Sequence, residues 1–257
     1  MNVSVVIPTR GDVSMLPVIA SFPKEWEIVI YDNGHGEVRI LPAGDDSPRL
    51  VKDVPDLSVY ARYYAAIEYA SHDLILTQDD DVIVSDPEAI VDTFLATREC
   101  SEHGPMARQV APTSGIAVWA CDEHDPKPCV LDAIVANMPR EFRHDGYTDS
   151  CLVGFGACFH RDAPVRAFDR YAKVVAGGWC PPYPTMWGKT SLPNPTNDQS
   201  FLRTCDVVFT TLTPRVLVDV AKTDREMASD PTRMWKQPGH LGERTRMLEL
   251  ARKVRDA

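Results

Sequence analysis

Several features that would assign a common function are missing from this sequence. None of its seven cysteines forms a CxxC pair, and no apolar stretch approaches the roughly 20 residues that a membrane-spanning helix needs. The opening MNVSVVIPTRGD lacks the basic region and apolar run of a signal peptide. There is no GxGxxG and no GxxxxGK[ST], which argues against dinucleotide and P-loop sites. We therefore expect a soluble, cytoplasmic protein with reduced thiols.

A basic surface for nucleic acid is also missing. The 257 residues carry 27 Lys and Arg against 37 Asp and Glu, for a formal net charge of -10. Phosphate backbones need an accessible basic surface, so nucleic acid is not expected as a partner. A nucleotide ligand remains compatible with this charge, because a bound metal ion inverts the local electrostatics.

The first hundred residues alternate between short apolar runs and amphipathic segments. The predicted strands are Val3–Ile7, Glu27–Tyr31 and Leu74–Thr77, and the predicted helices are 13–20, 58–71 and one that follows the cap Asp86. Strands and helices in this order predict an α/β fold with a mostly parallel sheet flanked by helices. Ligands of such sheets bind beyond the carboxyl ends of the strands. The segments expected around one cleft are therefore 9–12, 32–34 and 79–81.

Three consecutive carboxylates, Asp79, Asp80 and Asp81, follow the third predicted strand. Like charges side by side repel one another and add nothing to a core. They are tolerated around a divalent cation, since Mg²⁺ and Mn²⁺ select oxygen ligands. Asp79 and Asp81 share one side of the chain while the strand stays extended, which leaves Asp80 in a structural role.

The second half of the chain is less regular. The predicted strands are 115–120, 152–159, 207–211 and 216–220, with a short helix at 197–204 and a basic amphipathic helix at 243–255. We expect a single domain over 1–257, in which about 1–97 form a nucleotide-binding half and about 98–257 an acceptor half. The terminal basic helix is compatible with packing on the domain, a partner subunit or peripheral membrane contact.

Four segments together resemble the GT-A glycosyltransferases, especially family 2, including phage-encoded members. They are SVVIPTRGD, IVIYDNG, ARYYAAIEYASHDLILTQDDD and TNDQSF. The resemblance implies a UDP- or GDP-type sugar donor held through its diphosphate by Mn²⁺ or Mg²⁺. It implies a hydroxyl acceptor on a protein, a lipid or a saccharide.

The resemblance also implies roles for individual residues. For the donor nucleotide and its diphosphate these are Pro8, Thr9, Arg10, Asp32, Arg62, Asp79, Asp80 and Lys236. In this assignment Asp32 contacts the base and Asp79 lies near the ribose. Asp81 and His240 are the implied metal ligands. Ordinary alternatives stay open: Asp32 in an Asx turn, Arg62 paired with Glu68 or on a solvated face, and His240 in a solvated loop.

Asp198 matches the family's general base, which removes the acceptor proton in inverting enzymes. It would serve equally as a helix N-cap, and Asn197 stands where the family has an acid. Gly154 and Gly156 allow close backbone approach to a sugar, or a strand bulge. Trp179 and Trp187 offer flat faces to sugar rings, or pack a loop onto the core.

The resulting hypothesis is a metal-dependent glycosyltransferase of the hexosyltransferase class, inverting with Asp198 as base. One alternative is a sugar nucleotidyltransferase, which would carry a GxGTR-like signature where this chain has PTRGD. A further alternative is a non-catalytic nucleotide- or carbohydrate-binding domain, which would need no general base.

Overall fold

The computed structural model describes residues 2–11, 13–34, 48–101, 115–118, 153–175, 199–213, 215–218, 222–224 and 237–257. Within them lies a seven-stranded sheet in the order β3-β2-β1-β4-β7-β6-β8. Its strands, in chain order, are β1 (Val3–Thr9), β2 (Glu27–Asp32), β3 (Arg49–Val51), β4 (Leu74–Thr77), β6 (Gly115–Val118), β7 (Ala157–His160) and β8 (Arg215–Val218). The pairs β2–β3, β1–β2, β1–β4 and β6–β7 are parallel, whereas β4–β7 and β6–β8 are antiparallel.

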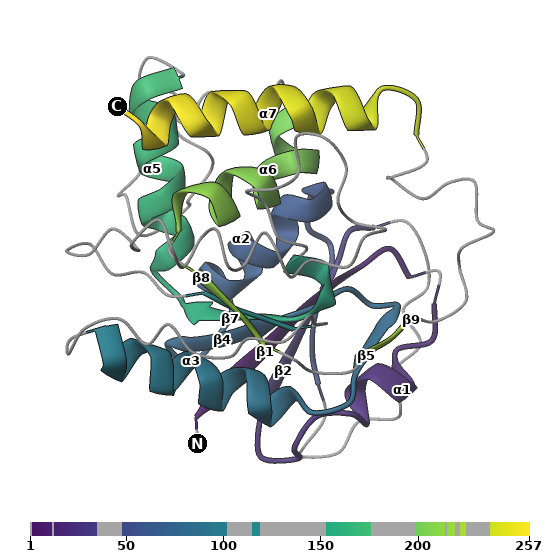
Figure 1. Cartoon of the computed structure of the whole chain (residues 1–257). Coiled ribbons are helices and arrows are strands. Elements are labelled where there is room, and N and C mark those ends of the chain that lie inside the picture. The colour runs from purple at the N-terminus through teal and green to yellow at the C-terminus, as the bar shows by residue number, and fades with distance from the viewer. Residues whose placement is uncertain are drawn as a thin grey trace.

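Helices cover the sheet on both faces, as Figure 1 shows. One face carries α2 (Ala61–Glu68), α5 (Ala163–Val175), α6 (Gln199–Leu212) and α7 (His240–Arg255). The other carries α1 (Leu16–Ile19) and α3 (Pro87–Ser101). The described residues also contain two 3-10 turns, η1 (Ser58–Tyr60) and η3 (Val153–Phe155). A separate two-stranded sheet pairs β5 (Val82–Val84) with β9 (Lys222–Asp224). The predicted α/β architecture with a mostly parallel sheet is confirmed.

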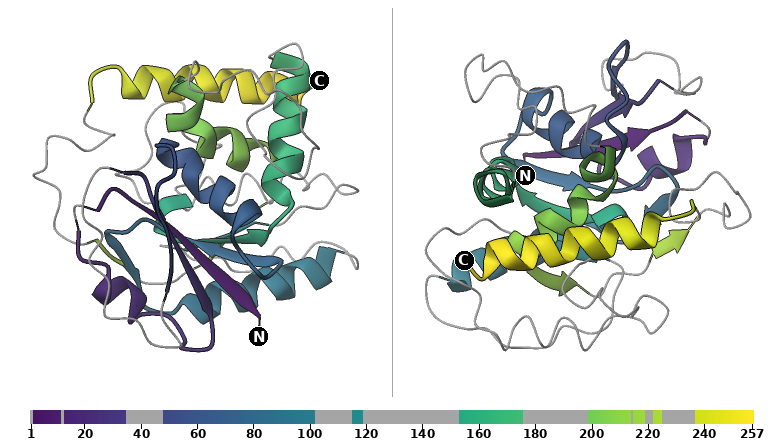
Figure 2. Two further views of the ribbon diagram at one scale, coloured as in Figure 1. Left: turned by 180° about the vertical axis from the view of Figure 1, so that it is seen from behind. Right: turned by 90° about the horizontal axis from the view of Figure 1, so that it is seen from above.

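The sheet separates two apolar clusters, because side chains of a strand alternate between its faces. Val6 of β1 belongs to the cluster under α2, α5, α6 and α7, whereas Val5 and Ile7 belong to the cluster with α3. Strand β1 is buried along its whole length, as expected of a parallel strand covered on both sides. In Figure 2, α7 lies outermost, across α6 and away from the sheet.

The strand directions gather several segment ends at one edge of the sheet. Parallel pairing sets Thr9 opposite Asp32 at the ends of β1 and β2, and Val6 opposite Thr77 at the end of β4. Strand β7 runs the other way and starts at Ala157, opposite Thr77. The segment before β7 therefore meets the segment after β4 at the carboxyl edge of the sheet.

Several predicted element boundaries are confirmed by the structure. Strand β4 covers Leu74–Thr77 as expected. Asp86 accepts a hydrogen bond from the Ala89 N–H (3.0 Å), the capping contact predicted for the helix that begins at Pro87. Among the described residues no helix has the length and apolar character needed to cross a bilayer.

Two predictions in the second half are corrected. The segment 207–211 is helical, because α6 continues from Gln199 to Leu212. Phe201, Cys205 and Phe209 recur at four-residue spacing and are fully buried, so tertiary packing overrides the β preference of the run VVFTT. The segment 152–159, expected as one strand, is a 3-10 turn followed by β7.

Candidate active site

The three acids lie in a turn beyond the end of β4, which we call the acid loop (Gln78–Asp81). The Asp79 N–H donates to the Gly154 carbonyl at 2.8 Å, and the Val82 N–H donates to the Asp79 carbonyl at 3.3 Å. The chain turns at Asp80 and Asp81, so the extended strand on which the expected shared face of Asp79 and Asp81 depended is not present. The backbone contact to Gly154 fixes the loop at the edge of the sheet.

Each acid of the loop has its own surroundings. Asp79 accepts a hydrogen bond from Arg62 Nη2 at 2.7 Å while 41% of its side chain remains exposed. Asp80 accepts from the Thr9 hydroxyl at 2.6 Å, which ties the loop to the end of β1. Asp81 is half-buried. The sequence-based prediction that Asp80 has a structural role agrees with its contact to Thr9.

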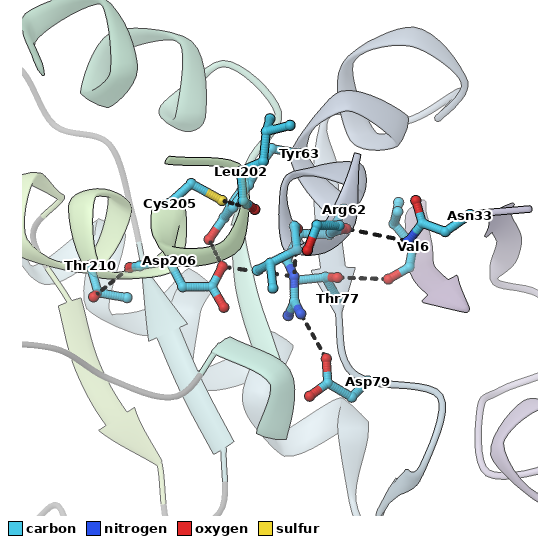
Figure 3. Close-up of polar contacts among 12 residues, drawn as sticks. Val6, Asn33, Arg62, Tyr63, Thr77, Asp79, Leu202, Cys205, Asp206 and Thr210 are labelled. Atoms are coloured by element: carbon cyan, nitrogen blue, oxygen red, sulfur yellow. Dashed lines mark hydrogen bonds and ion pairs between the residues drawn. The ribbon is translucent and has the colours of Figure 1, made fainter. Parts of the chain in front are cut away.

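Arg62 projects from the first turn of α2 into the space between the acid loop and α6 (Figure 3). Its side chain is only 3% exposed, and it lies between Asp79 and Asp206, with Nε 3.8 Å from Asp206 Oδ1. Burial disfavours the charge, but Asp206 and Asp79 outweigh burial and raise the pKa of the guanidinium above its ordinary value. Both ordinary alternatives for Arg62, a solvated face and a pair with Glu68, are therefore wrong.

Asp206 is a site residue that the sequence analysis missed. It lies on α6, is 7% exposed, and accepts a hydrogen bond from the Tyr63 hydroxyl at 2.6 Å. Burial raises the pKa of Asp206, although Arg62 and the Tyr63 hydroxyl pull it back down. A polar residue inside the apolar periodicity of 201–212 was the available signal, and the strand predicted over 207–211 concealed it.

The ends of β1 and β2 form the second part of the edge. The Asn33 side chain accepts from the Leu57 N–H and donates to the Ser58 carbonyl, and the Asn33 N–H donates to the Thr9 carbonyl. Asp32 is buried, and one carboxylate oxygen accepts from the Gly34 N–H at 2.9 Å. The Asx turn proposed as an alternative for Asp32 is thus present, and Asn33 joins three chain segments.

Pro8 and Arg10 flank Thr9 at the end of β1. Pro8 is buried within the strand, whereas the Arg10 side chain is exposed. The Thr9 hydroxyl also accepts a hydrogen bond from the Gly11 N–H at 3.0 Å. The three residues expected to line the nucleotide pocket therefore end at the same edge as the acid loop, and Arg10 extends farthest into solvent.

Gly154 is required by close packing against the acid loop. A Cβ added there would lie 2.0 Å from Asp79 Oδ2, well inside contact distance. Gly156 has a positive φ of 113°, and a Cβ there would lie 3.1 Å from Ile90. The glycines expected near the sugar therefore serve two needs: Gly154 makes room for the Asp79 carboxylate, and Gly156 supplies the backbone turn into β7.

His240 differs from the solvated loop residue considered as an alternative. It is the first residue of α7, it is 7% exposed, and its Nδ1 has no hydrogen-bond partner among the described residues. Burial, together with the charges of Arg244 and Arg203, lowers the pKa of His240 to about 4. The imidazole is therefore neutral at physiological pH, the form that ligates metals, although two nearby guanidinium groups oppose a cation.

The remaining predicted site residues, Asp198, Trp179, Trp187 and Lys236, lie outside the described residues. Asp198 directly precedes Gln199, the first residue of α6, in the sequence. Within the part of the chain that the structure describes, no three acidic, histidine or cysteine side chains form a ready cage for a metal ion.

No protein-family model matches the chain, and no curated protein sequence matches it. Solved structures similar to this one include a TarS chain and a mannosyltransferase. S. aureus TarS 1-349 in complex with UDP shares 12% identity over 85% of this chain and 57% of its own, with a TM-score of 0.41. The mannosyltransferase PcManGT from Pyrobaculum calidifontis, in complex with GDP-Man and Mn²⁺, shares 14% identity over 82% of this chain and 72% of its own, with a TM-score of 0.30. The chain thus spans less than two thirds of the TarS chain.

Substituting Gly154→Ala should destabilise the protein. The new methyl group displaces the Asp79 carboxylate and leaves Arg62 buried with one neighbour fewer, which we expect to cost about 1–3 kcal/mol. Chemical denaturation measures the loss. Gly242→Ala is the control, because nothing lies within 4 Å of a Cβ there, and it should be neutral or slightly stabilising. Equal stability of Gly154→Ala and wild type would contradict the close contact.

The stability of the protein should fall as the pH drops from about 6.5 to about 4. In this range the unfolded chain binds a proton at His240 and the folded protein does not, so each pH unit costs about 1.4 kcal/mol at this residue. His240→Asn should flatten this part of a plot of unfolding free energy against pH. His72→Gln is the control variant, because it also removes an imidazole but at a partly exposed position. Parallel curves for His240→Asn and wild type would show that His240 is not the source.

Proposed function

We propose that this chain is a metal-dependent glycosyltransferase of the hexosyltransferase class, which moves a sugar from a nucleoside-diphosphate sugar to a hydroxyl acceptor. The observation that carries the proposal is the acid loop, held at the carboxyl edge of a parallel sheet by Arg62, Thr9 and Gly154. Three adjacent carboxylates bring oxygen ligands together at the edge where ligands of mostly parallel sheets bind.

The donor nucleotide is proposed to lie against the ends of β1 and β2. Pro8, Thr9 and Arg10 line its pocket, and Asp32 contacts the base. One Asp32 oxygen closes the Asx turn with Gly34, which holds the carboxylate in a fixed orientation at this edge. Asp79 lies toward the ribose, with Arg62 behind it.

The donor set fits a hard divalent cation, Mn²⁺ or Mg²⁺. Mg²⁺ is commonly held by one or two carboxylates together with substrate phosphates and water, so a complete protein cage is not required. We propose Asp81 as the direct ligand, Asp80 beside it, and His240 as a further ligand in its neutral form. When bound, the metal neutralises charge that develops on the leaving diphosphate. Lys236 is proposed to contact the same phosphates.

The acceptor is proposed to approach from the α6 side. Asp198, directly before α6 in the sequence, takes the proton of the acceptor hydroxyl. The hydroxyl oxygen bonds to the anomeric carbon on the face opposite the nucleoside diphosphate, which leaves as its bond to that carbon breaks, so the configuration is inverted. Gly154 lets the segment before β7 lie against Asp79, beside the proposed sugar site, and Gly156 supplies the turn into β7. Trp179 and Trp187 are proposed to stack on sugar rings. The whole chain is proposed to act as one domain, and the buried free thiols of Cys158 and Cys205 suit a reducing compartment such as the cytoplasm.

One nucleotide sugar should raise the melting temperature only when Mn²⁺ is present. A donor at a hundred times its dissociation constant adds about 2.7 kcal/mol of stability, which corresponds to several degrees in a protein of this size. A thermal-shift panel of UDP and GDP sugars, with and without chelator, measures this response. Asp81→Ala should abolish it, whereas Glu249→Ala removes an exposed acid from α7 and should not. If no donor binds under any metal condition, the enzyme proposal fails.

Asp198→Ala should spare donor binding and reduce transfer by 10²- to 10⁴-fold, the usual contribution of a general base. Transfer to an acceptor is followed by release of nucleoside diphosphate, and the anomeric configuration of the product by NMR. Asp198→Asn keeps the shape and a capping oxygen, so it separates the base from a helix cap. Unchanged turnover in Asp198→Asn, or a product with retained configuration, would show that Asp198 is not an inverting base.

A further inference from the structure

Asp206 is a buried carboxylate without a role in the proposed reaction. It faces two consecutive residues of α2, with the Tyr63 hydroxyl 2.6 Å and Arg62 Nε 3.8 Å from the same oxygen, Oδ1 (Figure 3). Burying a carboxylate is expensive, and apolar replacements often stabilise a core more than a buried ion pair does. The position of Asp206 therefore suggests a purpose beyond the stability of the helical layer.

The contacts of Arg62 indicate that purpose. Arg62 is almost fully buried, and its hydrogen bond to Asp79 reaches an acid loop that is partly open to solvent. If Asp79 were its only counter-ion, movement of the loop would leave a buried guanidinium unpaired. Asp206 is a second counter-ion on a rigid helix, so Arg62 keeps its charge and its place whatever the loop does. Asp206 thus holds Arg62 independently of the acid loop, as a fixed hydrogen-bond donor for Asp79.

The Tyr63 ring holds this arrangement from the other side. It packs against Phe168 and Phe209, with ring centroids 5.1 and 5.0 Å away, so its hydroxyl is fixed by α5 and α6. A rigid hydroxyl donor orients the Asp206 carboxylate toward Arg62. The sequence of contacts from the aromatic core to the acid loop is therefore Tyr63, Asp206, Arg62 and Asp79.

We propose that Asp206 is a positioning residue of the donor site: through Arg62 it sets the position of Asp79 and of the acid loop. The consequence for donor binding rests on the proposed function, but the effect on the loop does not. Asp206 also lies on the helix that Asp198 directly precedes, so α6 connects the proposed base with the donor acids.

Asp206→Asn tests the proposal, because it keeps the shape and an acceptor for Tyr63 but removes the charge that holds Arg62. The first measurement is hydrogen exchange of the acid-loop amides, including the Asp79 N–H that donates to Gly154. We expect exchange about tenfold faster in the variant, with exchange in the strands of the sheet unchanged. Tyr63→Phe keeps the Asp206 charge and removes only the hydroxyl that orients it, so amide exchange in the acid loop should rise less. This variant replaces Asp206→Asn in the test if Asp206→Asn does not fold. Asp169→Asn is the control, since it makes the same change on α5, where Asp169 pairs with Lys173.

The second measurement is the dissociation constant of the nucleotide sugar found in the thermal-shift panel, with Mn²⁺. Asp206→Asn should weaken donor binding about tenfold and raise KM by a similar factor, with a smaller change in kcat. In an Asp79→Ala background the same substitution should have no further effect, because Asp206 acts through Asp79. A purely structural Asp206 would instead lower the melting temperature and leave donor affinity unchanged, or add independently to Asp79→Ala.

The two measurements separate the two proposals. If wild type binds no donor but loop exchange rises in Asp206→Asn, the glycosyltransferase proposal fails and the positioning role stands. If loop exchange in Asp206→Asn matches wild type, the positioning role is overturned whatever the donor data show.

Discussion

A buried guanidinium with two carboxylates is the constraint on which the site depends. Arg62 cannot lose its proton and cannot reach water, so the chain around it must supply negative charge from both sides. Asp79 supplies it from the sheet edge and Asp206 from the helical layer. These acids are 127 positions apart in the chain (206 − 79), so their shared contact with Arg62 joins the two halves of the sequence at one point.

The direction of β7 makes this meeting possible. Had β7 continued the parallel order beside β4, its carboxyl end would lie at the acid edge and its preceding turn at the opposite edge. Because it runs antiparallel, the turn that precedes it meets the acid loop, and the Gly154 carbonyl accepts the Asp79 N–H. The lack of a side chain at Gly154 then leaves space for the carboxylate that Arg62 holds. The direction of β7, the missing side chain at Gly154 and the hydrogen bond from Arg62 together fix the position of Asp79.

Local patterns in the sequence predicted the part of the site that lies on consecutive strands. The apolar run before Asp79 and the cap at Asp86 are signals carried by neighbouring residues, and the structure confirms both. Asp206 was missed because the strand predicted over 207–211 concealed the helical periodicity around it, and because its partners Arg62 and Tyr63 are distant in sequence. The sequence likewise did not predict that Arg62 is buried, because a lone arginine on an amphipathic helix is usually solvated. The short strands β3, β5 and β9 also escaped prediction, because three residues give no periodicity.

The different exposure of the acids follows from the same geometry. The Asp80 carboxylate accepts a hydrogen bond from Thr9, which fixes it to the sheet. Asp79 is held by Arg62 on its buried side, while two fifths of its side chain is exposed to solvent. A loop tied at both of these points keeps its backbone in place but still presents carboxylate oxygen outward. Protein oxygens arranged in advance lower the entropy lost when a ligand binds. Under the proposed function, donor binding at this edge of the sheet therefore offsets the folding cost of the buried Arg62 charge.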